Sequence, residues 1–488
     1  MSIQCSLIFG WKKSENGLFY GWKKSKNDYN YGWKKSKNGV LIMHLKRKIE
    51  AYLNSWINTK KGLLIKGQRQ VGKTYIVDHC LKPYFDNVVQ INLLLDKNLC
   101  SILSTCKNSE NFLDRLHLYF NFDDKKEKVL LFIDEIQESY RYQNNIPNND
   151  YIDLLTISKS IITSTKIRVV FSGSLLGIEI FDVLNKVDSL PMGYVDIVEM
   201  FPIDFEEFLW ANNINEQIIG NLVDCFNNKI PIDNAIHTRM TELFNQYLLI
   251  GGMPDAVKSF IENRNLQEVN NIHKQINNYI SADISKYASI NDKLKIKEIY
   301  KILPSELNSQ TKRFNLKDIK DFKKSLNLNL SFSWLTNAGI AIPVFNTNDL
   351  TIPLKIDSHR NLLKLFHADV GLLTYLYFDI TVKQKLLIGD LNVNKGSIVE
   401  NFVAQQLHAH GFEELYYYNN KRNGELDFVV VHNSNILPIE IKSGKDYKRH
   451  SALNNVLSNS NRQLPEAFVF CNSNIKKVGK ITYFPIYF

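Results

Sequence analysis

The sequence predicts a multidomain α/β protein whose first folded region is a parallel sheet of the doubly wound kind. Four apolar runs separated by helical patterns are typical of buried parallel strands, near residues 62–66, 88–93, 129–134 and 167–172. A glycine-rich motif at residues 67–74 directly follows the first run, and acidic residues follow the third. Much farther along the chain, the pattern at residues 424–444 predicts a β-hairpin with two largely apolar faces.

The composition is that of a globular protein with substantial cores. The chain has 488 residues, 44% of them hydrophobic, and at about 150 residues each this length predicts about three domains. No apolar run approaches the ~20 residues that a membrane span needs, and no signal-peptide pattern begins the chain. The six cysteines are scattered without metal-binding spacing. We therefore expect a cytoplasmic protein with reduced thiols and no membrane partner.

The first 42 residues hold more than half of the formal net charge of +10, because they contain eight lysines and two acids. They include three copies of Gly-Trp-Lys-Lys-Ser-x-Asn at a spacing of 11 residues. Glycine, serine and asparagine favour neither a helix nor a strand, so we expect residues 1–42 to be disordered. Two interpretations remain open. The tail is an arm that stacks on bases and contacts phosphates, or it is translated repeat DNA upstream of a start at Met43.

The motif at residues 67–74 has the pattern G-x-x-x-x-G-K-T between a strand and a helical stretch. Its glycines let backbone N–H groups converge on an anion, and the helix N-terminus adds partial positive charge. We expect Lys73 to contact the β- and γ-phosphates of ATP and Thr74 to hold Mg²⁺. The predicted nucleotide-binding residues are Gly67, Gln68, Arg69, Gln70, Val71, Gly72, Lys73, Thr74 and, from a later strand, Ser172.

Two acids, Asp134 and Glu135, end the apolar run near 129–134. At the end of a strand beside a phosphate loop, Asp134 is expected to bind Mg²⁺ through water and Glu135 to orient or deprotonate the attacking water. The alternative is an ordinary acid pair at a helix N-terminus. Ser172 ends the next strand and is expected to sense the γ-phosphate, the alternative being a plain strand-to-helix turn.

Taken together, these motifs resemble bacterial and archaeal AAA-type ATPases whose C-terminal domain of unknown function resembles restriction endonucleases. The matching stretches, spread over residues 43–488, are GQRQVGKT, LLFIDEIQE, VVFSGSLLG, MFPIDFEEFL, YLLIGGMPDAV, ISADISKY, FHADVGLL and GELDFVVV…LPIEIKSG. The resemblance implies a P-loop ATPase with ATP and Mg²⁺ as cofactors. Relatives often carry Gly-Arg or Gly-Lys where this chain has Gly193–Tyr194; Arg69 and Arg239 are candidate substitutes for that basic residue.

The patterns and the resemblance together divide the chain into five parts. These are the tail 1–42, an AAA-type ATPase domain 43–212, a helical lid 213–300, a winged-helix-like region 301–355 and a restriction-endonuclease-like domain 356–488. The winged-helix prediction uses two helical patterns, a strand near 341–345 and six basic residues from Lys312 to Lys324. That basic face is expected to contact DNA phosphates, or to be a solvated face on a packing module.

In the hairpin of residues 424–444, the position of the turn places Asp427 opposite Glu440, with Lys442 two residues farther on. Two carboxylates this close share a proton or hold a cation between them, and oxygen ligands suit Mg²⁺. Lys442 is then placed to stabilise developing charge or to activate water. The resemblance to restriction endonucleases makes Asp427, Glu440 and Lys442 candidate catalytic residues.

Glu400, on the helical stretch before the hairpin, joins Asp427 and Glu440 as a candidate metal ligand through the same resemblance. Two structural alternatives stay open at this point. Glu425 opposite Lys442 makes a plain cross-strand ion pair, and Ser397 with Glu400 makes a helix capping box.

The sequence thus predicts an ATP hydrolase coupled to a winged helix and a metal-dependent nuclease-like domain that acts on nucleic acid. The alternative is an ATP-driven signalling or defence switch with an inactive nuclease-like binding domain. DNA is the candidate macromolecular partner, through the winged helix and the nuclease-like domain. The sequence does not distinguish DNA from RNA or protein partners, and an oligomer with a trans-acting arginine is compatible with it.

Overall fold

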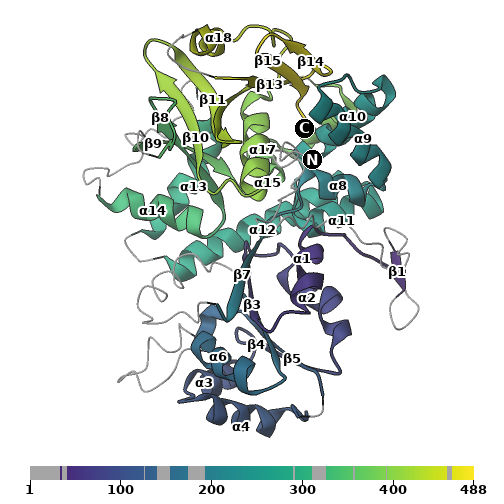
Figure 1. The fold of residues 1–488 in the computed structure, drawn as a ribbon, viewed down its shortest axis with the longest axis vertical. Helices are drawn as coiled ribbons and strands as arrows, with labels where there is room; N and C mark the ends of the chain where they lie inside the picture. Colours follow the sequence, from purple (N-terminus) through teal and green to yellow (C-terminus); the bar gives the residue numbers. More distant parts are fainter. Residues whose placement is uncertain are drawn as a thin grey trace. The chain divides into compact units, whose positions relative to one another are not determined.

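The computed structural model describes most of the chain and divides it into two compact units (Figure 1). The parallel-sheet unit comprises residues 47–201 and 333–339. The mixed-sheet unit comprises residues 1–46, 202–332 and 340–488. The residues that the structure describes are 33–35, 41–125, 127–139, 154–173, 193–288, 292–309, 326–355, 358–391, 393–458 and 464–488.

In the described part of the parallel-sheet unit, five parallel strands lie in the spatial order β4-β5-β6-β3-β7. They are β3 (Gly62–Gly67), β4 (Asn87–Asn92), β5 (Val129–Asp134), β6 (Arg168–Gly173) and β7 (Val195–Met200). The four strands predicted from apolar runs are confirmed, and β7 is an additional strand. Because the strands are parallel, the glycine-rich motif after β3 and the acids after β5 leave the same edge of the sheet, with β6 between them.

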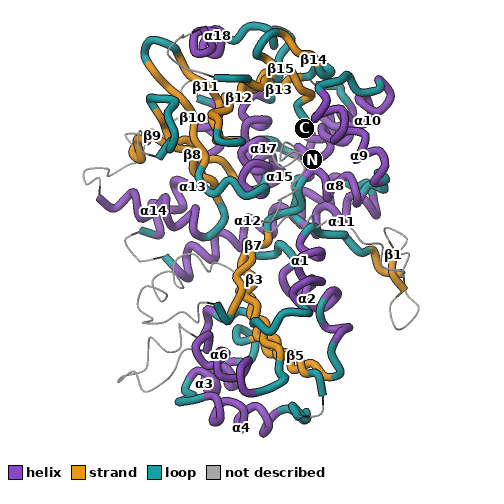
Figure 2. The backbone as a smooth tube through the Cα atoms, in the orientation of Figure 1, coloured by secondary structure: helices purple, strands orange, loops and turns teal. Residues whose placement is uncertain are grey.

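Helices cover both faces of this sheet (Figure 2). Leu63 and Ile65 of β3 pack with α1 (Ile49–Trp56) and α2 (Lys73–Cys80), which η2 (Lys82–Tyr84) follows. Leu64 packs on the opposite face, against α3 (Lys97–Ser104), α4 (Ser109–Tyr119) and α6 (Leu154–Ser164). Successive strand residues point to opposite faces, so burial of both faces explains why the apolar run is uninterrupted.

The mixed-sheet unit contains a helical region and a sheet region. Its helical region comprises α8 (Phe205–Ala211), α9 (Glu216–Asn228), α10 (Asn234–Ile250), α11 (Pro254–Asn263), α12 (Leu266–Tyr287) and α13 (Lys293–Asn308). Helix α14 (Leu326–Asn337) follows, and its residues from Ser333 onward belong to the parallel-sheet unit. The turn between α10 and α11 needs its glycines. A Cβ on Gly251 would lie 2.3 Å from Asp369 Oδ1, and one on Gly252 would lie 2.1 Å from the carbonyl oxygen of Ile203.

The sheet region has eight described strands in the order β14-β15-β13-β12-β11-β10-β8-β9. Their bounds are β8 (Ala341–Thr347), β9 (Ser358–His367), β10 (Leu415–Asn420), β11 (Gly424–His432), β12 (Asn435–Lys442), β13 (Ala467–Cys471), β14 (Lys476–Val478) and β15 (Ile481–Pro485). The helices of this region are α15 (Val370–Tyr377), α16 (Ile380–Ile388), α17 (Gly396–Ala409) and α18 (Ser451–Ser458). Helix α17 packs on β8, β9, β10 and β12, and α18 packs on β11.

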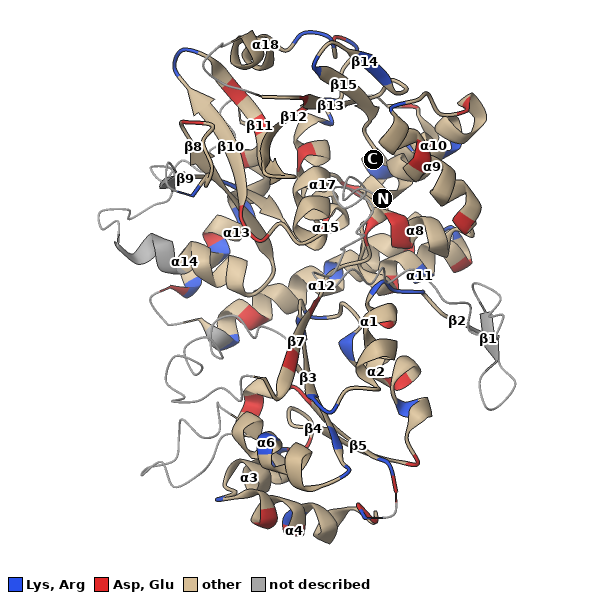
Figure 3. Ribbon diagram, viewed as in Figure 1, with Lys and Arg blue, Asp and Glu red and all other residues tan. Residues whose placement is uncertain are grey.

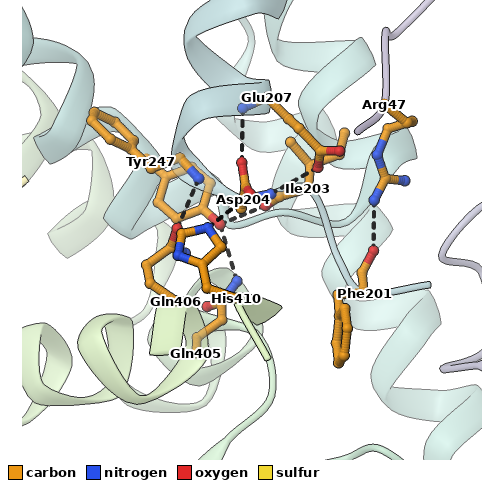
Figure 4. Close-up of polar contacts among 10 residues, drawn as sticks. Arg47, Phe201, Ile203, Asp204, Glu207, Tyr247, Gln405, Gln406 and His410 are labelled. Atoms are coloured by element: carbon orange, nitrogen blue, oxygen red, sulfur yellow. Dashed lines mark hydrogen bonds and ion pairs between the residues drawn. The ribbon is translucent and has the colours of Figure 1, made fainter. Parts of the chain in front are cut away.

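Buried polar contacts join the helical region to α17 (Figure 4). Tyr247 of α10 donates to the carbonyl oxygen of Ile203 at 2.5 Å and accepts from Gln405 Nε2 at 3.0 Å. His410 Nε2 lies 3.2 Å from Asp204 Oδ2, and Asp204 caps α8 in a capping box with Glu207. Buried polar groups are costly unless paired, so these contacts help to hold the helical region and the sheet region together.

The structure divides the chain at other residues than the sequence predicts. Residues 202–212, expected in the ATPase domain, belong to the mixed-sheet unit. The strand expected in a winged helix is β8, which pairs antiparallel with β9 and parallel with β10. The predicted boundary at residue 355 therefore falls between two paired strands of one sheet. The parallel partner of β8, strand β10, is distant in sequence, and local sequence patterns do not reveal such a pairing. The basic segment Lys312–Lys324 lies outside the described residues.

One strand occurs within the N-terminal tail. Strand β1 (Trp33–Lys35) pairs antiparallel with β2 (Leu41–Met43), so the expectation that the tail forms no strand is wrong at these residues. Pairing gives partners to the backbone groups of both segments, which composition alone does not predict. The first two copies of the repeat lie outside the described residues.

Candidate nucleotide site and a second acidic site

At the end of β3, where the loop to α2 begins, the backbone adopts a conformation that only glycine fits. Gly67 has a φ of 156°, and a Cβ there would lie 2.3 Å from the carbonyl oxygen of Met200. Gly72 is left-handed, with a φ of 97°, and is the N-cap of α2. The loop therefore turns tightly against the end of β7 and directs its chain into the helix N-terminus, where backbone N–H groups have no intrahelical acceptor.

Lys73 lies across its own loop. Its amine donates to the carbonyl oxygens of Gly67 at 3.0 Å and Gln68 at 2.9 Å, and its side chain is buried. Burial lowers the pKa of Lys73 to about 8, although the charges of Glu135 and Asp134 raise it; the nearby Arg69 lowers it further. A buried ammonium in a loop of backbone dipoles is a strong anion attractor.

Asp134 is the centre of a hydrogen-bond network at the carboxyl edge of the sheet. Its Oδ2 accepts from Thr74 Oγ1 at 2.8 Å and from Asn92 Nδ2 at 3.4 Å, and its Oδ1 accepts from the Ser172 hydroxyl. The structure thus brings together Thr74, Asp134 and Ser172 from three separate elements. The sequence missed Asn92, which ends β4, because an asparagine at a strand end is also an ordinary turn residue.

Glu135, directly after Asp134, has a left-handed backbone with a φ of 58°. Non-glycine residues rarely adopt this conformation, and such residues cluster at functional sites. Its carboxylate accepts a hydrogen bond from the side-chain amide of Gln137, a buried residue that no sequence motif identifies.

Arg47 is a further residue that the sequence did not identify. Only 6% of its surface is exposed. Its guanidinium donates to the carbonyl oxygen of Val71, in the phosphate loop, at 3.1 Å and to that of Phe201, just after β7, at 2.6 Å (Figure 4). It therefore ties the phosphate loop to the residue that directly follows β7. In the sequence Arg47 stands between two lysines, so nothing marks it as the buried one.

The second acidic site lies on the hairpin of β11 and β12. The ladder pairs Phe428 with Ile439, a register that sets Asp427 beside Glu440, as predicted. Asp427 Oδ2 accepts from the backbone N–H of Ile441 at 2.8 Å. Glu440 Oε1 forms an ion pair with Lys442 at 2.6 Å. Burial, followed by the charge of Asp427, raises the pKa of Glu440 to about 8.

Lys442 responds to three acids. Burial alone would lower its pKa, but Glu440 and then Asp427 and Glu400 raise the pKa of Lys442 above its ordinary value. Glu400 is buried on α17. Because its charge contributes to the raised pKa of Lys442, it lies within electrostatic range of the hairpin. In the part of the chain that the structure describes, no three His, Cys, Asp or Glu side chains form a ready metal-binding cluster. The site is therefore a pair of carboxylates with a lysine, and Glu400 lies close by.

Both structural alternatives for this site are wrong. Glu425 pairs with Lys364 at 2.7 Å, whereas Lys442 pairs with Glu440. The β11–β12 ladder ends at Phe428–Ile439, before the pair of Glu425 and Lys442 would be reached. Helix α17 begins with Lys395 as its N-cap and has no side-chain cap, so the Ser397–Glu400 capping box is not formed.

The candidate substitute arginines have different surroundings. Arg69 lies within electrostatic range of Lys73. Arg239 is on α10 in the other unit and forms an exposed ion pair with Glu242 at 3.0 Å. Tyr194 lies just before β7 and stacks with the amine of Lys159, 4.8 Å from the ring centre. Among the described helices, none is long and apolar enough to cross a membrane.

Comparisons with known proteins agree with the parallel-sheet unit. Residues 59–209 match a family described as an AAA domain. Residues 241–385 and 395–487 match two families described as domains of unknown function, DUF8612 and DUF4143. No curated protein matches the chain. The AAA match covers the phosphate loop and the acids after β5, and it supports an AAA-type ATPase in this part of the chain.

Two solved structures are similar at low sequence identity. The Walker-type ATPase PABY2304 of Pyrococcus abyssi is 14% identical; the match covers 71% of this chain and 98% of that chain, with a TM-score of 0.43. The ORC2 protein of Aeropyrum pernix, in ADPNP–ADP complexes, is 13% identical, with 70% and 93% covered and a TM-score of 0.31.

Proposed function

We propose that the parallel-sheet unit binds Mg-ATP and hydrolyses it to ADP and phosphate. The observation that supports this most is the convergence of Thr74, Asp134 and Ser172 beside the buried amine of Lys73. The hydroxyl of Thr74 and the carboxylate of Asp134 are 2.8 Å apart, and such an oxygen pair suits Mg²⁺, which binds through one or two carboxylates and substrate phosphates. When bound, Mg²⁺ neutralises charge that develops on the phosphate oxygens.

The chain's own residues would perform four tasks. Backbone N–H groups of the loop and of the α2 N-terminus bind the phosphates. Lys73 moves from the loop carbonyls to the β- and γ-phosphate oxygens and neutralises them. Glu135, held by Gln137, accepts a proton from the attacking water. Ser172 reports on the γ-phosphate through its hydrogen bond to Asp134.

The test separates binding from chemistry. Glu135→Gln should keep ATP affinity within about 2-fold and lower phosphate release at least about 100-fold, because proton transfer in the transition state contributes about 10²–10⁴-fold. The matched control is Glu138→Gln, three residues on, which should leave both quantities unchanged. Affinity is measured by calorimetry, and turnover by phosphate release. Equal turnover in Glu135→Gln and wild type would remove Glu135 from the mechanism.

A second candidate function is metal-dependent cleavage of phosphodiester bonds at Asp427, Glu440 and Lys442. It is favoured by one observation: within the described residues, the buried Oε2 of Glu440 has no hydrogen-bond partner, although Asp427 lies beside it. The Asp427 and Glu440 oxygens suit Mg²⁺, which when bound polarises a phosphodiester and activates water. Asp427 and Glu440 would hold the ion, with Glu400 in support, and Lys442 would stabilise charge on the phosphate.

This second function is tested by cutting. Purified protein is incubated with plasmid DNA or with RNA in Mg²⁺ or Mn²⁺, and Glu440→Gln is compared with wild type. We expect cutting that falls at least about 100-fold in the variant, as when one group of a metal site is lost. If nothing is cut, or the variant cuts equally well, the hairpin is an inactive binding module. Nucleic acid that stimulates ATP turnover would separate a nuclease-coupled ATPase from a switch that responds to proteins.

A further inference from the structure

The mixed-sheet unit carries an exposed basic surface that no function above has used. It consists of seven side chains on three segments, residues 421–423, 443–450 and 472–477: Lys421, Arg422, Lys445, Lys448, Arg449, Lys476 and Lys477. Asp446 is the one acid in these segments. Figure 3 shows basic residues along the loop before α18 and on β14.

The topology of the sheet brings the three segments to one edge. β10 and β12 are both antiparallel to β11, and β12 is parallel to β13. The loops that follow β10, β12 and β13 therefore leave the sheet at the same end. These loops contain five of the basic residues, and the other two, Lys476 and Lys477, begin β14 directly after the last loop. Because β14 is antiparallel to β15, it begins at the same end, so the seven basic side chains form a band across strand ends. Lys442, the last residue of β12, is three residues before Lys445, so the acidic site lies at the same end.

Direct contacts hold the three segments together. Asn472 Nδ2 donates to the carbonyl oxygen of Ser443 at 2.7 Å, and the Tyr447 hydroxyl donates to Ser473 Oγ at 3.3 Å. A Cβ on Gly424 would lie 3.0 Å from Ala452 Cβ, which sets the β10–β11 turn against the start of α18. The loops are thus fixed relative to one another, and so are the bases that they carry.

The charges of this surface are available to a partner. Within the described residues, none of the seven bases forms an ion pair with a carboxylate, whereas Lys229, Lys355 and Lys364 of the same unit each do. From β14 to β10 there are five strand-to-strand steps, which at ~4.8 Å each make a band of about 24 Å. At 3.4 Å per phosphate of one strand, this spans about seven nucleotides.

We propose that this surface binds the phosphate backbone of a nucleic acid and delivers it to the acidic site. Delivery to the acidic site rests on the proposed nuclease function, in which Asp427 and Glu440 act on a phosphodiester. Several neighbouring bases on fixed loops neutralise several neighbouring phosphates at once, a match that a polyanion supplies and a single anion does not. Sequence is not read by such contacts, so binding is independent of base sequence.

The experiment measures binding without cutting. Full-length protein is titrated into labelled 20-base-pair DNA, and separately into single-stranded RNA of the same length, in EDTA. Fluorescence anisotropy is followed at several salt concentrations. The triple variant Lys445→Gln, Lys448→Gln, Arg449→Gln should weaken binding about 100-fold at 0.1 M salt and lower the log–log salt slope by about 2–3, since each contact contributes about 0.9 on duplex DNA.

A matched variant removes equal charge from α12 and α13: Lys274→Gln, Lys297→Gln, Lys301→Gln, three exposed lysines of the same unit. It should bind as wild type does, and thermal unfolding of both triples should match wild type. Three outcomes would contradict the proposed binding surface: equal weakening of nucleic-acid binding in the two triple variants, no weakening in the first, or no binding by the wild type. Lost binding in the first triple together with unaffected cutting by Glu440→Gln would keep the surface and remove the nuclease. The nucleic acid that binds more tightly, duplex DNA or single-stranded RNA, identifies the preferred partner.

Discussion

Asp134 and Glu440 are both buried carboxylates near the end of a strand, but their neighbours differ. The exposed fractions are 3% and 5%, so burial does not distinguish them. Asp134 accepts hydrogen bonds from the neutral side chains of Thr74, Asn92 and Ser172. Glu440 instead faces the ammonium of Lys442 and the carboxylate of Asp427.

The difference teaches how each site is prepared. Neutral donors from several elements fix the position of Asp134. The ammonium of Lys73 lies within electrostatic range of Asp134 but donates to the carbonyl oxygens of Gly67 and Gln68, so the oxygens of Asp134 remain available to a cation. Glu440 is already neutralised in part by Lys442, and a metal ion has to compete with that amine. The nucleotide site is therefore organised before its ligand binds, whereas the hairpin site gains its order from the cation.

The largest effect is expected from Lys73→Ala. It removes the buried ammonium on which phosphate neutralisation depends, so ATP turnover should fall at least about 1,000-fold, equivalent to about 4 kcal/mol of transition-state stabilisation. The control is Lys66→Ala on β3, the strand before the phosphate loop; its amine forms a half-exposed pair with Glu199 at 2.9 Å and should matter little. Phosphate release measures both. If Lys73→Ala kept its ATP turnover, the ammonium of Lys73 would not be the group that neutralises the phosphates. The contrast between the nucleotide site and the hairpin site would then be contradicted.

The next effect is on stability. Gly67→Ala places a Cβ 2.3 Å from the carbonyl oxygen of Met200 and strains a φ of 156°, so unfolding free energy should fall by about 3 kcal/mol. Gly220→Ala is the matched change in helix α9, where a Cβ meets nothing within 4 Å. It should stabilise the protein by about 0.5–1 kcal/mol. Urea denaturation measures both, and equal effects would contradict a tightly built loop.

A smaller, kinetic effect is expected from Arg47→Gln. Losing the guanidinium frees the carbonyl oxygens of Val71 and Phe201 and loosens the phosphate loop, so the KM for ATP should rise about 10-fold, or about 1.4 kcal/mol, while kcat changes little. Arg47→Lys, which keeps charge but not the fork, should recover only part of this. The exposed Lys60→Gln serves as control. A purely structural role would lower the melting temperature and leave KM unchanged.

The sequence predicted what is local. The strand, glycine loop and helix of the nucleotide site follow one another in the chain, so their pattern contains the geometry. The same holds for Asp427 opposite Glu440, because the turn of a hairpin fixes its register. Thr74 and Asp134 are distant in sequence, but both follow parallel strands, and the carboxyl ends of parallel strands share one edge.

What the sequence could not give depends on distant pairing. β8 looks like an isolated strand, and nothing in its residues indicates β10 as its parallel neighbour. Lys364 is fully buried and pairs with Glu425, although β10 and β8 lie between their strands, β11 and β9, in the sheet. Local patterns contain hydrophobicity and turn chemistry, but the choice between two lysines for one glutamate is made by tertiary packing.

The smallest effect is the pH dependence of stability that Glu440 introduces. Its pKa is about 8 in the folded chain and about 4.5 in the unfolded chain, so the folded state binds the proton more tightly between these values. Stability that depends on this proton is complete at low pH and is lost as the pH rises through about 8. We expect a loss of about 1 kcal/mol from pH 5 to 8, kept small because Lys442 compensates the new charge.

Glu440→Gln should flatten this slope, because glutamine keeps the shape and has no proton to lose. The control is Glu466→Gln, a half-exposed partner of Lys229, which should leave the slope as in wild type. Thermal unfolding is measured at pH 5 and 8, with and without Mg²⁺. Mg²⁺ binds the ionised pair and so should raise the midpoint of wild type at pH 8 but not that of Glu440→Gln. A slope of opposite sign, or an equal response to Mg²⁺ in the variant, would mean that Glu440 is a structural partner of Lys442 and that the hairpin does not await a cation.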